Sequence, residues 1–122
     1  MKPRFEVECA VWHPTMGADA IETAVGLKPR MGWSAGDPDR NTGSAQDRTY
    51  CRFELGTYSQ EQISAGLDML GRFNVLASDL QFKEATGIIS VYFKNMDDAA
   101  ELHLNLQNLR TLTMLGASVV FR

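Results

Sequence analysis

Residues 4–12 read Arg-Phe-Glu-Val-Glu-Cys-Ala-Val-Trp, and the alternation in this stretch decides the fold. The odd positions carry the apolar side chains of Phe5, Val7, Cys9 and Val11. The even positions carry Glu6, Glu8 and Ala10. A period of two is typical of a strand with one buried and one wet face, which favours a sheet with antiparallel pairs. Because Pro14 has no N–H to donate, we expect the strand to end at His13-Pro14.

Further along the chain, segments with the period of two that is typical of strands alternate with segments that have helical spacing of apolar residues. The predicted strands cover residues 48–55, 88–94 and 117–121. The predicted helices cover residues 17–25, about 59–73 and 106–115. Gly26 and Gly116 are expected to end two of these helices, and Ser59 with Gln62 predicts a capping box.

In two stretches the pattern of apolar residues does not define the secondary structure as clearly. Residues 78–85 are expected to add a further helical turn or two. Residues 97–106 fit either an extended segment, because Leu102, Leu104 and Leu106 alternate with polar residues, or the start of one long helix. The element order predicts an α+β fold in a single domain, residues 1–122. We expect one mixed or largely antiparallel sheet of about four strands, with roughly two to three helices packed mainly on one face.

Composition and charge exclude several classes of protein. Apolar residues make up 44% of the chain and charged residues 22%, which is typical of a globular domain and disfavours disorder. The formal net charge is −3 and the basic residues do not cluster, so we expect no nucleic-acid partner. The chain shows neither a signal peptide nor about 18 consecutive apolar residues, so we expect no membrane association and a cytoplasmic location.

No familiar catalytic motif is present. The sequence contains no Cys-x-x-Cys pair and none of the GxxxxGK[ST], GxGxxG, GxSxG or HExxH patterns. We therefore assign no catalytic residue, no metal and no cofactor. Cys9 and Cys51 lie on apolar strand faces and are interpreted as small core residues, with a Cys9–Cys51–His13 metal site left as a weak alternative.

The remaining polar candidates have a structural and a functional interpretation. His13 ends a strand and is interpreted as a histidine that hydrogen-bonds its own turn, and less readily as an active-site residue. Asp37 and Asp39 flank Pro38, which is typical of β-turns, although paired carboxylates also bind metals or act as acid and base. In both cases the turn interpretation is preferred.

The most promising surface involves aromatic residues and an irregular loop. Residues 28–47 are rich in glycine and proline and are expected to form a long loop with Trp33 at its centre. Trp33 either anchors a partner or folds down on the sheet as a lid. Trp, Tyr and Arg are the usual anchors of protein interfaces. The candidate partner-binding residues are Trp12, His13, Arg30, Trp33, Asp37, Asp39, Arg40 and Tyr50.

The order of motifs resembles a bacterial family, the domain of unknown function DUF4279. The resembling blocks are His13-Pro14, Ile-Glu-Thr-Ala-Val-Gly-Leu-Lys-Pro at 21–29, Trp-Ser-Ala-Gly-Asp-Pro at 33–38, the aromatic strand 50–55, and 109–118 with the strand after it. One departure is Cys51, where such sequences often have Trp. The resemblance implies a compact intracellular bacterial α+β domain and assigns no catalytic residues. Small proteins of this type often sit beside polymorphic toxins as candidate immunity proteins.

Three functions follow as hypotheses. The first is a non-enzymatic protein-binding domain, in its specific form an immunity protein that neutralises a toxin by direct binding. The second is a small-molecule or metal-dependent enzyme that uses His13 with Asp37 or Asp39. The third is a structural module that oligomerises through an exposed strand edge. The sequence alone leaves the partner and the oligomeric state open.

Overall fold

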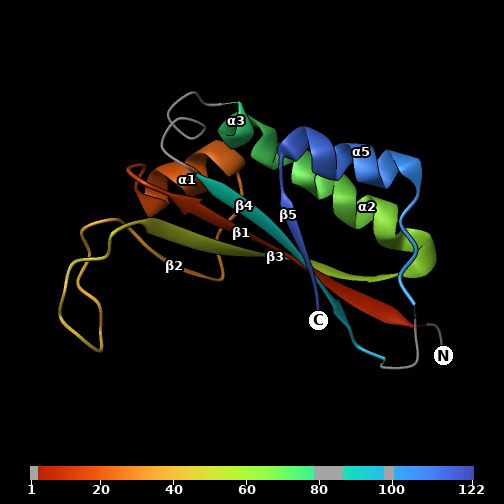
Figure 1. Cartoon of the computed structure of the whole chain (residues 1–122), viewed down its shortest axis with the longest axis horizontal. Coiled ribbons are helices and arrows are strands. Elements are labelled where there is room, and N and C mark those ends of the chain that lie inside the picture. Colours follow the sequence, from red (N-terminus) through yellow and green to blue (C-terminus); the bar gives the residue numbers. More distant parts are fainter. Residues whose placement is uncertain (1–2, 79–86, 98–100) are drawn as a thin grey trace.

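A computed structural model describes residues 3–78, 87–97 and 101–122, in which five strands form one mixed sheet (Figure 1). The strands are β1 (Arg4–His13), β2 (Met31–Trp33), β3 (Thr49–Ser59), β4 (Ile88–Asn95) and β5 (Ser118–Phe121). Their order is β2-β3-β1-β4-β5. The central strand β1 pairs antiparallel with both β3 and β4, β2 pairs antiparallel with β3, and β5 runs parallel to β4. The α+β fold class is confirmed, with one strand more than expected.

The helices lie together on one face of this sheet (Figure 1). They are α1 (Ala18–Val25), α2 (Ile63–Asp68), α3 (Asn74–Ala77) and α5 (Leu106–Leu115). Two 3₁₀ segments, η1 (Gln60–Gln62) and η2 (Met69–Phe73), flank α2 and make 60–77 one continuous helical stretch. Gly26 and Gly116 end α1 and α5 in the left-handed conformation, as predicted. No helix among the described residues has the length and apolar character needed to cross a membrane.

The core fills the space between the helices and the odd-numbered face of β1. Its largest side chains include Phe5, Phe53, Phe73 and Phe93, each at most 1% exposed. The rings of Phe53 and Phe73 meet edge to face at 5.1 Å and join β3 to the helical stretch. Cys9 and Cys51 lie in this core as free thiols. Burial raises the pKa of Cys9 far above its usual value and, with a smaller contribution from Glu22 and Asp19, raises that of Cys51 to about 11, so both thiols are unreactive.

A β-bulge in β3 changes which residues face the helices. Val7 pairs with Gly56 but Glu8 pairs with Glu54, so Leu55 is the extra residue. Gly56 has a φ of 114°, which favours glycine at this position. Beyond the bulge, Tyr58 pairs with Phe5 and therefore lies on the helix side, where its hydroxyl donates to the carbonyl of Leu55. The bulge thus places a tyrosine ring against α2.

Gly66 of α2 leaves room for that ring, which yields a stability prediction. A Cβ at Gly66 would lie 2.6 Å from Cε2 of Tyr58, whereas a Cβ at Gly71 would meet nothing within 4 Å. Gly66→Ala is expected to lower the free energy of unfolding by about 1–2 kcal/mol because the ring must move. The matched control Gly71→Ala should raise it by about 0.5 kcal/mol or leave it unchanged. Urea unfolding measures both, and equal effects of the two substitutions would contradict the packing argument.

The structure corrects the predicted helix start at Ser59. Ser59 belongs to β3, its side chain makes no capping hydrogen bond, and Gln62 is not part of a capping box. The side-chain amide of Gln60 instead donates to the carbonyl of His103 and accepts from its N–H, both at 2.7 Å. This pair of bonds ties the backbone of His103 to the start of the helical stretch.

Residues 101–105 are not helical, so the alternative of one long helix is wrong for them, and residues 98–100 of the predicted stretch lie outside the described residues. Leu102 and Leu104 pack against the core from this segment, which explains their alternation with polar residues. Helix α5 begins at Leu106, where Asn105 and Asn108 form a reciprocal capping box. Of the turns predicted over 78–85, only Ser78 is described, and the rest of that prediction lies outside the described residues.

Candidate functional site

The sheet face opposite the helices, named here the open face, carries the even-numbered residues of β1. Strand register arranges its side chains in four rows across the sheet. The rows consist of Ile88, Trp12, Tyr50 and Trp33; then Ser90, Ala10, Arg52 and Met31; then Tyr92, Glu8 and Glu54; and last Lys94, Glu6 and Thr57. The open face is therefore apolar at one end and charged at the other.

Trp12, Tyr50 and Trp33 form the aromatic row at the apolar end. The Tyr50 ring lies 4.3 Å from Trp12 and 4.9 Å from Trp33, measured between centroids. The indole N–H of Trp33 donates to the carbonyl of Arg48 at 3.0 Å. Tyr50 is buried, whereas both tryptophans are half-buried, so their outer edges remain available to a partner. The structure thus places Trp33 in the edge strand β2, with its ring packed against Tyr50. This corrects the expectation of a continuous loop over 28–47.

Gly32 permits this stacking because of its close approach to β3. A Cβ at Gly32 would lie 2.5 Å from the backbone oxygen of Tyr50, closer than real Cβ atoms come. Any other residue would push β2 away from β3 and carry Trp33 with it. The glycine before Trp33 is therefore a requirement of the aromatic row.

At the other end, the open face is hollowed over about 610 Å³, and this space is named here the charged hollow. Its lining residues are Glu6, Glu8, Arg30, Met31, Arg52, Glu54, Tyr92, Lys94 and Arg122. Glu8 lies at its floor with a side chain that is 8% exposed. One Glu8 oxygen accepts from Nε and contacts Nη2 of Arg52, and the other accepts from Nη1 of Arg30 at 3.3 Å. The Glu8 carboxylate thus links β1 to Arg52 of β3 and to Arg30, the residue before β2.

The carboxylates of the charged hollow have pKa values pushed in opposite directions. A hydrogen bond with Glu8, together with burial and the charges of Glu8 and Glu54, raises the pKa of Glu6. Burial alone would raise the pKa of Glu8, but the hydrogen bond with Glu6 and the ion pairs with Arg52 and Arg30 hold it below its usual value. Of this pair, Glu6 therefore binds a proton more readily and Glu8 less readily than an ordinary glutamate. Such a split is also found in acid–base pairs, but the described residues that line the hollow include no Ser, Cys or His nucleophile.

Four of the eight predicted partner-binding residues come together on this face. Trp12, Trp33 and Tyr50 form the aromatic row, and Arg30 reaches the charged hollow through Glu8. Sequence reasoning did not nominate Glu8, Arg52, Tyr92, Lys94 and Arg122. The even-numbered positions of 4–12, 48–55 and 88–94 already contained a signal for most of them, because polar residues recur there with a period of two.

His13 lies on the helix side of the sheet, away from the open face. It is fully buried, and its Nδ1 accepts hydrogen bonds from the backbone N–H groups of Thr15 at 3.1 Å and Met16 at 2.9 Å. These bonds are those of a histidine that stabilises its own turn. Among the described residues, no group of three or more His, Cys, Asp or Glu side chains is arranged to hold a metal ion.

Asp37, Asp39 and Arg40 belong to the loop between β2 and β3. Asp37 accepts from the N–H of Ser34 at 2.9 Å, and Asp39 accepts from that of Asn41 at 2.7 Å, so both carboxylates perform turn chemistry. Hydrogen bonds from the backbone N–H groups of Asn41 and Thr42 lower the pKa of Asp39. Asp39 and Arg40 line a second hollow of about 590 Å³ beside Trp33, and His13 is not among its lining residues.

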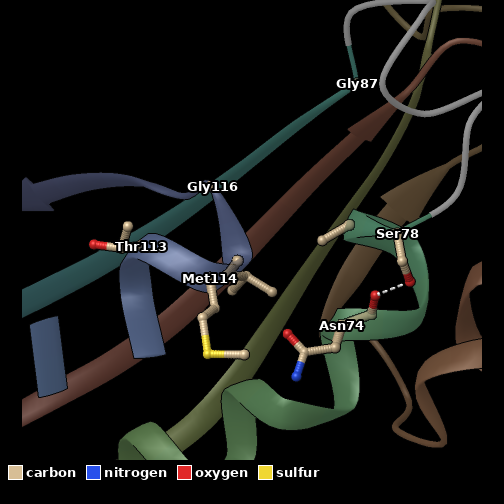
Figure 2. Close-up of a pocket in the computed structure, with 8 residues that line it drawn as sticks. Asn74, Ser78, Gly87, Thr113, Met114 and Gly116 are labelled. Atoms are coloured by element: carbon tan, nitrogen blue, oxygen red, sulfur yellow. Dashed lines mark hydrogen bonds between the residues drawn. The ribbon is translucent and has the colours of Figure 1, made fainter. Parts of the chain in front are cut away.

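A third hollow, of about 530 Å³, lies between α3 and the end of α5 (Figure 2). Figure 2 shows Asn74 and Ser78 on one wall, where the Ser78 hydroxyl donates to the carbonyl of Asn74, and Thr113 and Met114 on the other. Its described lining contains no ionisable side chain, so it offers little for recognition of a charged ligand or for acid–base chemistry.

Fold and site together define an α+β domain with a helix-covered face and an open face that joins aromatic and charged residues. Comparisons with protein-family models, with curated proteins and with solved structures find no match for this chain. The resemblance to DUF4279 is neither supported nor contradicted by them.

Proposed function

We propose that this domain acts by binding another protein on its open face. The observation that carries the proposal is that the aromatic row and the charged hollow adjoin on the sheet face opposite the helices. Trp, Tyr and Arg dominate the binding energy of protein interfaces, and all three are present here at one surface. Met31, which is 50% exposed, lies between the two parts and extends the apolar area.

The charge of the open face supports a protein partner more than a nucleic acid. The charged hollow contains four of the 12 cationic side chains and three of the 15 carboxylates, so its formal charge is close to neutral. A general nucleic-acid site would need an excess of cations to displace counterions from phosphates. Arg52 and Arg30 are moreover occupied by Glu8.

The more specific form of the proposal is that the partner is a bacterial toxin and that the domain is its immunity protein. The support for this form is the resemblance of residues 13–38 to DUF4279, together with an acidic chain of net charge −3. An immunity protein works by covering the active site of its toxin, which requires a binding surface and no catalytic groups of its own.

The test is binding to the product of the neighbouring gene, with survival of cells that express this product as a second readout. Trp33→Ala is expected to weaken binding about tenfold or more, as for an aromatic anchor. The matched control is Phe121→Ala, which removes an exposed aromatic ring from β5 on the side of Phe93 and away from the open face. No complex would refute the toxin form. A complex that Trp33→Ala leaves intact would refute binding through the aromatic row.

A further inference from the structure

The charged hollow contains four cations, and the two on its β4–β5 side, Lys94 and Arg122, differ from Arg30 and Arg52 in their ion pairing. Arg52 and Arg30 each form an ion pair with Glu8, whereas Lys94 and Arg122 form no ion pair with any described residue. Lys94 is exposed and lies opposite Glu6 in the register of β1 and β4. Arg122 follows Phe121, the partner of Phe93, and so adjoins Lys94 at the same end of the sheet. The charged end of the open face thus presents two cations without a direct ion pair to a described residue, although the charge of Lys94 acts on that of Glu6 across the strands.

Tyr92 holds one of these cations in place. The guanidinium carbon of Arg122 lies 4.6 Å from the centre of the Tyr92 ring, and that of Arg52 lies 5.2 Å from it. A cation over a tyrosine ring gains about 0.5–1 kcal/mol at exposed sites, enough to restrict the side chain without occupying its N–H donors. The planar donors of Arg122 therefore remain free for a planar acceptor, and a carboxylate matches them with two parallel hydrogen bonds.

We propose that Lys94 and Arg122 form a subsite for a carboxylate side chain of an acidic, extended segment of the protein bound on the open face. This inference rests on the proposed function and adds the chemistry of the partner. The two ends of the open face are six residues apart along β1, from Trp12 to Glu6, or about 20 Å at the rise of a strand. A segment with an aromatic residue about six positions from an Asp or Glu can therefore reach the aromatic row and the subsite together.

A defined peptide provides the test. The probe is a blocked eight-residue peptide with Trp near one end and three Glu at the other, and its twin carries Gln in place of Glu. Binding to the full chain is measured by calorimetry at low salt and by amide shifts in NMR spectra. The Glu peptide should bind about tenfold more tightly than the Gln peptide, because each subsite cation gains a charge-assisted hydrogen bond. Added salt should reduce this difference.

Substitutions at Lys94 and Arg122 test whether the preference for the Glu peptide arises at the subsite. Lys94→Gln combined with Arg122→Gln should abolish the preference for the Glu peptide. Arg110→Gln, an exposed cation of α5 on the opposite side of the sheet, should leave it unchanged. No preference for Glu in the wild-type chain, or a preference that survives the double substitution, would overturn the inference. Tighter binding of a single-stranded oligonucleotide than of the Glu peptide would also overturn it, in favour of a nucleic-acid occupant.

The failure of this inference can be distinguished from the failure of the proposed function. Trp33→Ala should weaken both peptides equally, since both carry the Trp that would contact the aromatic row. If Trp33→Ala weakens binding but the double substitution does not, the carboxylate subsite is wrong and the open face is still the binding surface. If neither set of substitutions changes binding, both proposals fail.

Discussion

Replacement of Glu8 by glutamine is expected to lower the free energy of unfolding at neutral pH by about 2–3 kcal/mol. The Glu8 side chain is 8% exposed and forms ion pairs with Arg52, whose own side chain is only 25% exposed, and with Arg30. A neutral amide preserves the volume but leaves the Arg52 charge without its counterion in a poorly solvated site. Urea unfolding at neutral pH measures the loss.

Glu54→Gln is the matched control for this experiment. Glu54 faces Glu8 across β1 and β3, is exposed, and forms no ion pair with any described residue. Its removal relieves repulsion between like charges, so the free energy of unfolding should stay within about 0.5 kcal/mol of wild type or rise. If Glu8→Gln were no more destabilising than Glu54→Gln, the buried ion pair would not be a stabilising feature of the open face.

The loss of unfolding free energy caused by Glu8→Gln should also depend on pH, and it should become smaller as the pH falls. The folded-state pKa of Glu8 lies below its usual value, so its carboxylate stabilises the fold above the unfolded-state pKa. This contribution is lost as the pH falls through the lowered pKa. Wild type and Glu8→Gln should therefore converge in stability as the pH falls below the usual pKa range of a glutamate side chain. Glu6 has the opposite sign, because its raised pKa stabilises the protonated form, so Glu6→Gln should not destabilise the fold at neutral pH.

His13→Leu is expected to have an effect of similar size, about 2–3 kcal/mol, for a different reason. Leucine fills a similar volume but cannot accept the N–H groups of Thr15 and Met16, which Nδ1 accepts in the wild type. His13→Asn offers Oδ1 as an acceptor for the same turn and should recover about half of the loss, the rest being the cost of its smaller volume. Thermal and urea unfolding of the two variants give the comparison.

The second histidine provides the control for His13. His103 is 74% exposed in its side chain, and its ring contacts Glu101 at 3.4 Å. His103→Leu should therefore change the free energy of unfolding by less than about 0.5 kcal/mol. If His13→Leu were equally mild, or if His13→Asn were no better than His13→Leu, the two backbone hydrogen bonds would not be what this buried histidine contributes.

Much of the open face follows from the alternation of residues 4–12. Because successive side chains of a strand point to opposite faces, the odd positions from Phe5 to Val11 had to face a core. Glu6, Glu8 and Trp12 had to face the other way. Trp12 and Tyr50 both lie on the open face, where their ring centroids are 4.3 Å apart. The roles of Asp37 and Asp39 in turns were also predictable, since short carboxylates bond to nearby N–H groups wherever the fold places them.

Other features depended on residues distant in the sequence. The capping box predicted at Ser59 did not form because β3 continues through Ser59 and Gln60 instead bonds to His103, 43 residues further along. The bulge at Leu55 was not predicted, because a single extra residue alters a register without altering the apolar pattern before it. Trp33 was predicted in a loop because a three-residue edge strand leaves no periodic signal.

By itself, the sequence determined which side chains of β1, β4 and the first part of β3 face the helices, the α+β class, and the local turn at His13, because these depend on periodicity and on bonds between near neighbours. Only the tertiary structure decided which strands lie side by side. The order β2-β3-β1-β4-β5 brings Arg30, Arg52, Tyr92, Lys94 and Arg122 around Glu8. Residues up to 114 positions apart meet there, and no local pattern in the chain records that pairing. The charged hollow is therefore a consequence of strand order, whereas the aromatic and polar character of the face that contains it is a consequence of alternation.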